Sequence, residues 1–247
     1  MTETSSSVGV PRAADPVDLS IVVPAYDEAA NLERLVAEVH AALDPLALAW
    51  ELIIVDDGST DGTGPLLDRL ADQDPRVRAV HQPERRGQTA ALQAGFAHVT
   101  APLIATLDAD LQCAPSDLPR LLAALGDADM ACGIRSSRHD PFSRRLASAL
   151  SNFARRLFLA RQIRDLAGPL RVFRTAALAR VTARAPLFDG AHRWLPALFT
   201  LAGCRVIQRP VAHRPRLAGT SKYTTRGRLL PIVREMFRVL DLKATRH

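Results

Sequence analysis

The chain has 247 residues, of which 47% are hydrophobic and 23% charged, and its formal net charge at pH 7 is +6. This ordinary globular composition allows one large domain with its own core and an element appended at one end. The three cysteines lie far apart and form no Cys-x-x-Cys pair, so the sequence indicates neither a disulfide framework nor a zinc site.

The N-terminal segment 1–18 is rich in serine and threonine and has no apolar core, so we expect a disordered tail and no signal peptide. No stretch approaches the roughly 20 continuous apolar residues that span a bilayer. We therefore expect a cytoplasmic protein without a transmembrane segment. Any contact with the inner face of the cell membrane would be peripheral.

Charge is distributed unevenly along the chain. Residues 1–134 carry a net charge of −13 and residues 135–247 carry +19. This division suggests an acidic half that uses a metal and a basic half that faces an anionic partner such as phosphate, a membrane surface or nucleic acid. A solvated basic surface without a specific partner is the alternative.

Apolar runs and helical spacing alternate over the first 110 residues. Strands are expected at 19–23, 51–55, 77–81 and 103–107, and helices at 31–43, 62–70 and 88–99. Pro24 is expected to end the first strand. This order predicts an α/β fold with a doubly wound, mostly parallel sheet and helices on both of its faces.

Polar loops follow the first two expected strands. After the first, Pro24 and Tyr26 could flank a nucleotide base. After the second, Asp57 could hold the base or ribose, and Gly58 permits a sharp turn. We expect the neighbouring residues Ser59 and Asp61 to cap the following helix.

The sharpest signal is Asp108-Ala109-Asp110-Leu111-Gln112, which directly follows the apolar run 103–107. Alternate residues at a strand end point to the same side, so one carboxylate could ligate a metal and the other could reach ribose or the metal. Ligands in open α/β sheets bind outside the carboxyl ends of the strands. This cluster therefore predicts a Mg²⁺ or Mn²⁺ site on a nucleotide diphosphate.

Three further segments carry functional signals. Gln88 stands at a helix start after Gly87, where backbone N–H groups could face phosphates or simply be capped. The basic loop 213–223 could close on an anion. Amphipathic stripes at 142–157 and 226–242 predict helices that pack on the core or lie on a lipid surface. The C-terminal part of the chain is therefore expected to be basic and helical.

In order and spacing, these motifs resemble family 2 glycosyltransferases of the branch that transfers sugars to dolichyl or undecaprenyl phosphate, which includes the dolichol-phosphate mannose synthase group. The segments that match are 23–28, 55–63, 87–90, 108–112, 133–135 and 213–223. The resemblance covers residues 19–225 and implies a GT-A fold, a UDP- or GDP-sugar donor, Mg²⁺ or Mn²⁺, and inversion at the anomeric carbon. Residues 226–247 are then a C-terminal amphipathic helix.

The resemblance also implies roles for individual residues, each matched to a family motif. The donor positions are Pro24, Ala25, Tyr26, Glu28, Asp57, Gln88, Asp108, Ala109 and Asp110, and the metal positions are Asp108, Asp110 and Gln112. The acceptor-phosphate positions are Arg135, Arg144, Ser148, Arg216, Ser221 and Lys222. His192 matches a segment on the acceptor side, and a packed histidine is the alternative reading.

The expected acceptor is a polyprenyl phosphate that receives a hexose. Its phosphate is already ionised near neutral pH, so the reaction would need Asp110 for the metal and Arg216 for the phosphate but no general base. A soluble saccharide or small-molecule acceptor is the alternative, and its neutral hydroxyl would require a base such as Asp165. Nucleic acid is not expected, because the paired carboxylates would repel a polyanion.

The chain departs from the family pattern in two places. Ala167 and Pro169 replace the usual residues on either side of Gly168, which affects the geometry expected for the acceptor site. Arg85 stands where an asparagine is common, two residues before Gly87.

Overall fold

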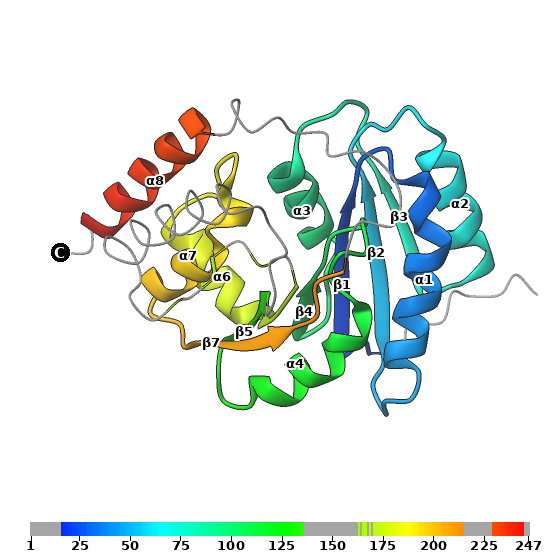
Figure 1. The fold of residues 1–247 in the computed structure, drawn as a ribbon, viewed down its shortest axis with the longest axis horizontal. Coiled ribbons are helices and arrows are strands. Elements are labelled where there is room, and N and C mark those ends of the chain that lie inside the picture. Colours follow the sequence, from blue (N-terminus) through cyan, green and yellow to red (C-terminus); the bar gives the residue numbers. More distant parts are fainter. Residues whose placement is uncertain are drawn as a thin grey trace, which may run out of the picture.

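The computed structural model describes residues 16–135, 163, 165, 166, 168, 170–214 and 229–244. Its described strands form one sheet in the order β3-β2-β1-β4-β6-β5-β7 (Figure 1). The strands are β1 (Leu19–Ala25), β2 (Trp50–Asp56), β3 (Val77–His81), β4 (Leu103–Thr106), β5 (Met130–Arg135), β6 (Arg171–Arg174) and β7 (Val206–Val211). All neighbouring pairs are parallel except β4 with β6 and β5 with β6.

Helices cover both faces of this sheet (Figure 1). One face packs against α1 (Ala29–Leu43), α2 (Thr63–Gln73) and α4 (Leu118–Leu125), which follows the short helix η1 (Pro115–Asp117). The other face packs against α3 (Gln88–Phe96), α6 (Thr175–Arg184), α7 (Leu195–Leu201) and α8 (Leu229–Ala244). The doubly wound α/β fold predicted from the sequence is confirmed.

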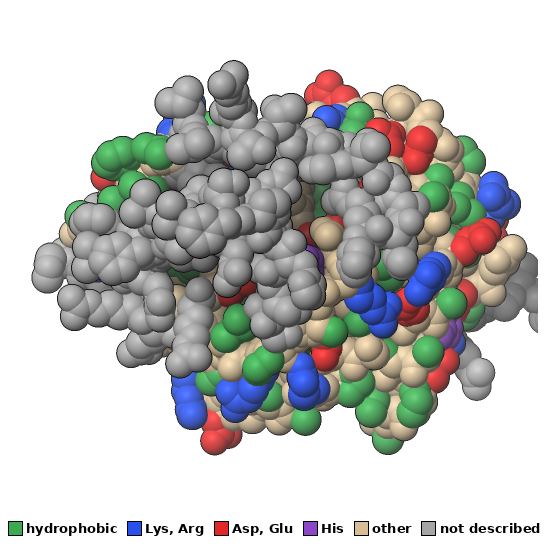
Figure 2. All heavy atoms as spheres, in the orientation of Figure 1, with side chains coloured by type: hydrophobic (Ala, Val, Ile, Leu, Met, Phe, Trp, Pro, Cys, Tyr) green, Lys and Arg blue, Asp and Glu red, His purple; other side chains and the backbone are tan. Residues whose placement is uncertain are grey.

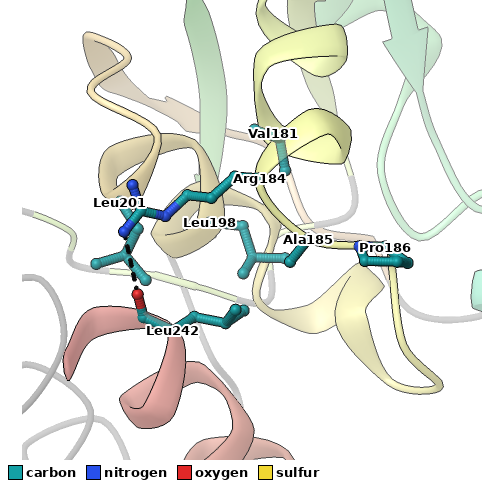
Figure 3. A pocket seen from close by; sticks show the side chains of 7 residues that line it. All are labelled: Val181, Arg184, Ala185, Pro186, Leu198, Leu201 and Leu242. Atoms are coloured by element: carbon teal, nitrogen blue, oxygen red, sulfur yellow. Dashed lines mark hydrogen bonds between the residues drawn. The ribbon is translucent and has the colours of Figure 1, made fainter. Parts of the chain in front are cut away.

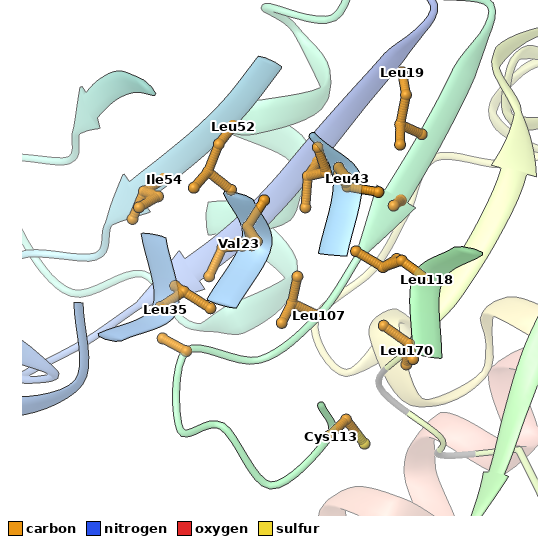
Figure 4. Close-up of a cluster of buried hydrophobic side chains, with 14 of the residues drawn as sticks. Leu19, Val23, Leu35, Leu43, Leu52, Ile54, Leu107, Cys113, Leu118 and Leu170 are labelled. Atoms are coloured by element: carbon orange, nitrogen blue, oxygen red, sulfur yellow. The ribbon is translucent and has the colours of Figure 1, made fainter. Parts of the chain in front are cut away.

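The alternation of side chains along each strand explains the two cores. Val23 and Ile54 point to the cluster under α1 and α2 (Figure 4), whereas Val22 and Val55 point to the cluster under α3. Successive residues of a strand face opposite sides of the sheet, so a strand that is apolar throughout must be buried on both faces. These strands therefore form the interior of the domain.

Several expected boundaries differ from the observed ones. Strand β1 continues through Pro24 because β4 pairs with β1 only as far as Val22↔Thr106. The carbonyl of Ala25 accepts the N–H of Asp57, so the nitrogen of Pro24 faces the opposite side, where no ladder bond is lost. Helix α3 ends at Phe96 rather than at residue 99.

The expected helical C-terminal part is interrupted by β6, a short strand that the sequence analysis did not predict and that completes the sheet between β4 and β5. Strand β6 is antiparallel to β4 and β5, so β5 and β7 end at the same edge as β1, β2 and β4. We call this the carboxyl edge. It also places Arg135, the last residue of β5, at that edge, beside the end of β7.

Candidate active site

The loops that follow β1 and β2 are joined into one unit at the carboxyl edge. The N–H of Asp27 donates to the hydroxyl of Ser59 at 2.8 Å, and the N–H of Thr60 donates to the Asp27 carboxylate at 2.8 Å. The N–H of Glu28 donates to the Thr63 hydroxyl at 2.9 Å. These hydrogen bonds fasten the expected donor loop to the loop that follows β2.

One of the two helix-capping expectations is wrong. Ser59 ties the two loops together through Asp27 and caps no helix. Asp61 does act at helix starts: its carboxylate accepts the N–H of Thr63, the first residue of α2, and the N–H of Ala29, the first residue of α1. A carboxylate is favourable at both positions because it satisfies N–H groups that have no partner within the helix.

Asp57 connects the second loop to the start of α3. Its side chain is buried, and its two carboxylate oxygens accept the N–H groups of Arg86 and Gly87 at 2.7 and 2.9 Å. A Cβ atom on Gly58 would lie 2.6 Å from the backbone nitrogen of Arg85. Asp57 and Gly58 therefore hold the 84–87 loop against the loop that follows β2.

Arg85 belongs to the candidate site through a contact that the sequence analysis did not predict. Its guanidinium lies over the ring of Tyr26, with Cζ 4.1 Å from the ring centroid. The departure from the family's asparagine was the available signal. A planar cation on an aromatic face extends the surface on which a nucleotide base can stack.

The acidic cluster lies in a turn beyond β4 and not on the strand itself. Strand β4 ends at Thr106, and Leu111 has a φ of 57°, so the expected strand alternation of Asp108 and Asp110 does not apply. The turn is ordered instead by local bonds: Gln88 Nε2 donates to Asp108 Oδ1 at 2.8 Å, and the N–H of Gln112 donates to Asp110 Oδ1 at 3.1 Å.

The turn provides a donor set suited to a hard cation. Asp108 and Asp110 supply two carboxylates and Gln112 supplies an amide oxygen, and Mg²⁺ typically uses one or two carboxylates together with substrate phosphates. Within the described ranges, no group of three or more His, Cys, Asp or Glu side chains is arranged to hold a metal. The residue types at 108–112 are those that Mg²⁺ takes together with a bound diphosphate, so the turn is a candidate metal site.

The start of the basic loop 213–223 lies directly beside this turn. His213 forms an antiparallel bridge with Cys113, and the N–H of Arg214 donates to the carbonyl of Gln112 at 2.8 Å. The Arg214 side chain pairs with Glu38 of α1 at 2.9 Å. The sequence suggested that the basic loop could close on an anion. The structure shows that the first two residues of this loop are hydrogen-bonded to the end of the turn at 108–112 and to Cys113.

Several expected acceptor residues lie outside the described residues. These are Arg144, Ser148, Arg216, Ser221 and Lys222, together with Ala167, Pro169 and the expected helix at 142–157. Asp165 lies among the residues that the structure describes, and it is buried, with 6% of its surface exposed. Burial raises the pKa of Cys132 to about 12, while Arg171 lowers it and Asp165 raises it, so both charged groups lie near that thiol.

His192 is brought next to Gln88 by a hydrogen bond that spans 103 residues of sequence. Its Nδ1 lies 2.8 Å from the hydroxyl of Thr89, which also accepts the N–H of Gly190 at 3.1 Å. The hydroxyl proton is therefore available for Nδ1. Burial, with the cations of Arg193 and Arg171, lowers the pKa of His192 to about 3, so its imidazole is neutral.

This neutral histidine predicts a pH effect on stability. Below pH 6.5 the unfolded chain takes up a proton at His192 that the folded chain binds only near pH 3. The unfolded state then binds more protons, so stability falls as the pH is lowered from 6.5 to 5, by about 2 kcal/mol for this group. We expect urea midpoints to fall less between pH 7 and 5 in His192→Asn, and equal falls would contradict the neutral state.

Comparison with known proteins decides the family. The glycosyl transferase family 2 model matches residues 20–182, which is more than half of the chain. The chain belongs to glycosyl transferase family 2. The family 2 match includes the loops after β1 and β2, the start of α3 and the turn at 108–112, and it ends before His192 and α8.

The family 2 relatives with curated names include undecaprenyl-phosphate 4-deoxy-4-formamido-L-arabinose transferases from Salmonella paratyphi A and Salmonella enteritidis PT4. Each is 32% identical to this chain over 220 residues, which cover 86% of this chain and 64% of the relative. The chain thus spans less than two thirds of the length of these relatives.

Solved structures support the same family 2 fold. The mannosyltransferase PcManGT from Pyrobaculum calidifontis, in complex with GDP-Man and Mn²⁺, has a TM-score of 0.62 at 19% identity and covers 94% of this chain and 74% of its own. Glucosyl-3-phosphoglycerate synthase from Mycobacterium tuberculosis, in complex with phosphoglyceric acid, has a TM-score of 0.62 at 19% identity, with coverages of 91% and 79%. The expected GT-A fold is therefore confirmed.

None of the helices in the described part of the chain combines the length and apolar character needed to cross a bilayer.

Proposed function

We propose that this family 2 protein is a metal-dependent inverting glycosyltransferase that moves a hexose from a UDP- or GDP-sugar to a polyprenyl phosphate. The observation that carries the proposal is the turn at 108–112. It lies at the carboxyl edge, where the Asp108 carboxylate accepts a hydrogen bond from Gln88 at the start of α3 and the carbonyl of Gln112 accepts the N–H of Arg214 in the basic loop. The names of the undecaprenyl-phosphate transferases support the lipid acceptor.

The donor would bind across the loops after β1, β2 and β3. Tyr26 and Arg85 offer a stacking surface for the base, and backbone groups of 24–28 can meet its edge. Asp57 holds the 84–87 loop in place, so that Gln88 can orient Asp108. Asp108, Asp110 and Gln112 would hold Mg²⁺ or Mn²⁺, which when bound neutralises charge on the leaving diphosphate.

The acceptor phosphate would be held by cations that the family resemblance assigns, Arg135, Arg144 and Arg216, with Ser148, Ser221 and Lys222 beside them. An ionised phosphate oxygen is itself the nucleophile, so no proton has to be removed. The protein's contribution on this side is to align the phosphate with the anomeric carbon, opposite the departing diphosphate.

A soluble acceptor is the second candidate. It is favoured by the structural neighbours, one of which is named as a complex with phosphoglyceric acid. A neutral hydroxyl acceptor would need a base, and the buried carboxylate of Asp165 would supply it. On a lipid phosphate acceptor, Asp165→Asn should leave turnover unchanged.

Release of nucleoside diphosphate tests these alternatives. Purified protein with Mn²⁺ and a panel of UDP- and GDP-sugars is given undecaprenyl phosphate in detergent, or soluble phosphates and saccharides. The panel includes an arabinose donor, because the relatives' name contains that sugar. Release that requires the lipid supports the proposal, and release driven by a soluble acceptor overturns it in favour of the second candidate.

We also propose that α8 lies on an anionic membrane surface. Among the residues that the structure describes, the exposed large hydrophobic side chains are Val233 and Phe237, at 41% and 57% exposed. Arg234 and Arg238 are exposed next to them. Hydrophobic side chains are visible on the surface where Figure 1 places α8 (Figure 2). An apolar strip beside arginines is suited to a layer of anionic headgroups.

Phe237→Glu is therefore expected to weaken binding to phosphatidylglycerol vesicles by about tenfold or more, since it removes apolar area and adds a negative charge. Co-sedimentation at two ionic strengths measures this effect. Gln73→Glu changes the charge equally on α2 and serves as the control. Equal binding by the two variants would exclude α8 as the contact.

A further inference from the structure

Helix α8 reaches the wall of the candidate donor site through one buried carboxylate. Glu235 is 6% exposed, and its two oxygens bond Arg193 Nη1 at 2.5 Å and Trp194 Nε1 at 2.8 Å. A Cβ atom on Gly190, whose φ is 86°, would lie 2.2 Å from the Glu235 carboxyl group. Residues 190–194, which include the short helix η2 (Ala191–Arg193), are therefore folded closely around this side chain.

Other contacts hold α8 to the domain independently of Glu235. Val239 is fully buried, and Arg184 of α6 donates to the carbonyl of Leu242 at 3.2 Å. Figure 3 shows this hydrogen bond at a small pocket between α6, α7 and the end of α8. Loss of the Glu235 carboxylate should therefore release residues 190–194 rather than the whole helix.

On its other side, the 190–194 segment holds the first turn of α3. The Thr89 hydroxyl bonds His192 Nδ1 and accepts the N–H of Gly190 and, at 3.4 Å, the N–H of His192. The segment thus contacts α3 at Thr89, the residue that follows Gln88.

Gln88 links this segment to the turn at 108–112, because its amide donates to Asp108 at 2.8 Å. Every step from α8 to Asp108 is therefore a direct contact between described residues: Glu235 with 190–194, 190–194 with Thr89, and Gln88 with Asp108. The buried carboxylate is costly to remove, because the buried Trp194 N–H would lose its acceptor and Arg193 would lose its ion-pair partner.

We infer that Glu235 is a positioning residue for the donor site, which it orients through residues 190–194 and the first turn of α3. The inference rests on the proposed function for the identity of the ligand, a metal-bound nucleoside diphosphate. Glu235 touches no substrate. It acts by keeping the Gln88 amide in position to bond Asp108. Misplacement of such groups by about 1 Å can lower the rate by up to about 100-fold.

The test measures binding of Mn²⁺ with UDP or GDP by calorimetry, independently of sugar transfer. We expect Glu235→Ala to weaken binding by about tenfold, and Glu235→Gln, which can still bond Trp194, to weaken it less. In turnover, KM should rise for the sugar nucleotide and stay unchanged for the acceptor. Asp129→Asn is the control, because Asp129 pairs with Arg180 just before β5, at the opposite edge of the sheet.

Thr89→Val tests the same connection from the α3 side if a Glu235 variant folds poorly. The two substitutions should be non-additive in a double-mutant cycle on the nucleotide dissociation constant. A fluorescence readout is also available. Trp50→Phe leaves Trp194 as the one tryptophan in the chain, and its emission should shift when Mn²⁺ and nucleotide bind.

Three results would overturn the inference. Wild-type nucleotide affinity in folded Glu235→Ala would overturn it alone, as would additive effects of Glu235→Ala and Thr89→Val. Failure of the wild-type protein to bind any nucleotide with Mn²⁺ would overturn the proposed function together with it.

Discussion

Replacing Asp110 with alanine should lower metal-dependent turnover by about a thousandfold or more. Asp110 is 7% exposed in the turn after β4, where it would hold the metal that stabilises the leaving diphosphate. The charge stabilisation that a metal supplies is worth several kcal/mol, and each factor of ten in rate corresponds to about 1.4 kcal/mol. The measurement is release of nucleoside diphosphate as a function of Mn²⁺ concentration.

Two variants make the Asp110 result specific. Asp110→Asn keeps the shape and the acceptor oxygen for the Gln112 N–H but loses the charge, so it should require more Mn²⁺ and still turn over slowly. Asp127→Ala removes an exposed carboxylate after α4 and should behave as wild type. Asp110→Ala activity within tenfold of wild type at saturating Mn²⁺ would remove Asp110 from the site.

The second large effect is expected at Gly58, where alanine should destabilise the protein by about 4 kcal/mol. Its φ is 68°, and an added Cβ would lie 2.6 Å from the backbone of Glu84 and Arg85. Strain in the left-handed region and overpacking against backbone each cost about 1–3 kcal/mol. The 84–87 loop would also be displaced from Asp57, so nucleotide binding should weaken.

Gly62→Ala separates these two causes. Gly62 has a φ of 94° but no atom within 4 Å of an added Cβ, so it should show the strain alone, about 1–2 kcal/mol. Urea unfolding of both variants measures the difference. If Gly58→Ala were no less stable than Gly62→Ala, the close approach of the 84–87 loop would not be a constraint.

Several strands could be predicted from the sequence because a strand buried on both faces of the sheet needs a continuous run of apolar residues. The strands predicted at 51–55, 77–81 and 103–107 match the observed strands to within one residue at each end. Their predicted parallel arrangement is also confirmed. Strand β6 was missed because only four residues, Arg171–Arg174, form it, and both ends are arginine. Its pairing with β4 and β5 depends on contacts that no local pattern reveals.

The candidate site was predictable where it follows strand ends and unpredictable where distant segments meet. The acidic residues at 108–112 were found because they follow an apolar run, although their turn geometry was not. The Thr89–His192 and Glu235–Trp194 bonds join residues 103 and 41 positions apart, so no sequence spacing reports them. Arg85 was noticed as a departure, but its position over Tyr26 required the fold.

Mass spectrometry of the organic phase tests most directly whether the protein transfers sugar to a lipid phosphate. Protein, Mn²⁺, the donor panel and undecaprenyl phosphate in detergent are incubated, and the lipid is extracted. The proposed function predicts a glycosylated undecaprenyl phosphate that is absent with Asp110→Ala, and the mass of the product identifies the class of sugar. Metal-dependent donor consumption without any sugar on the lipid would contradict it.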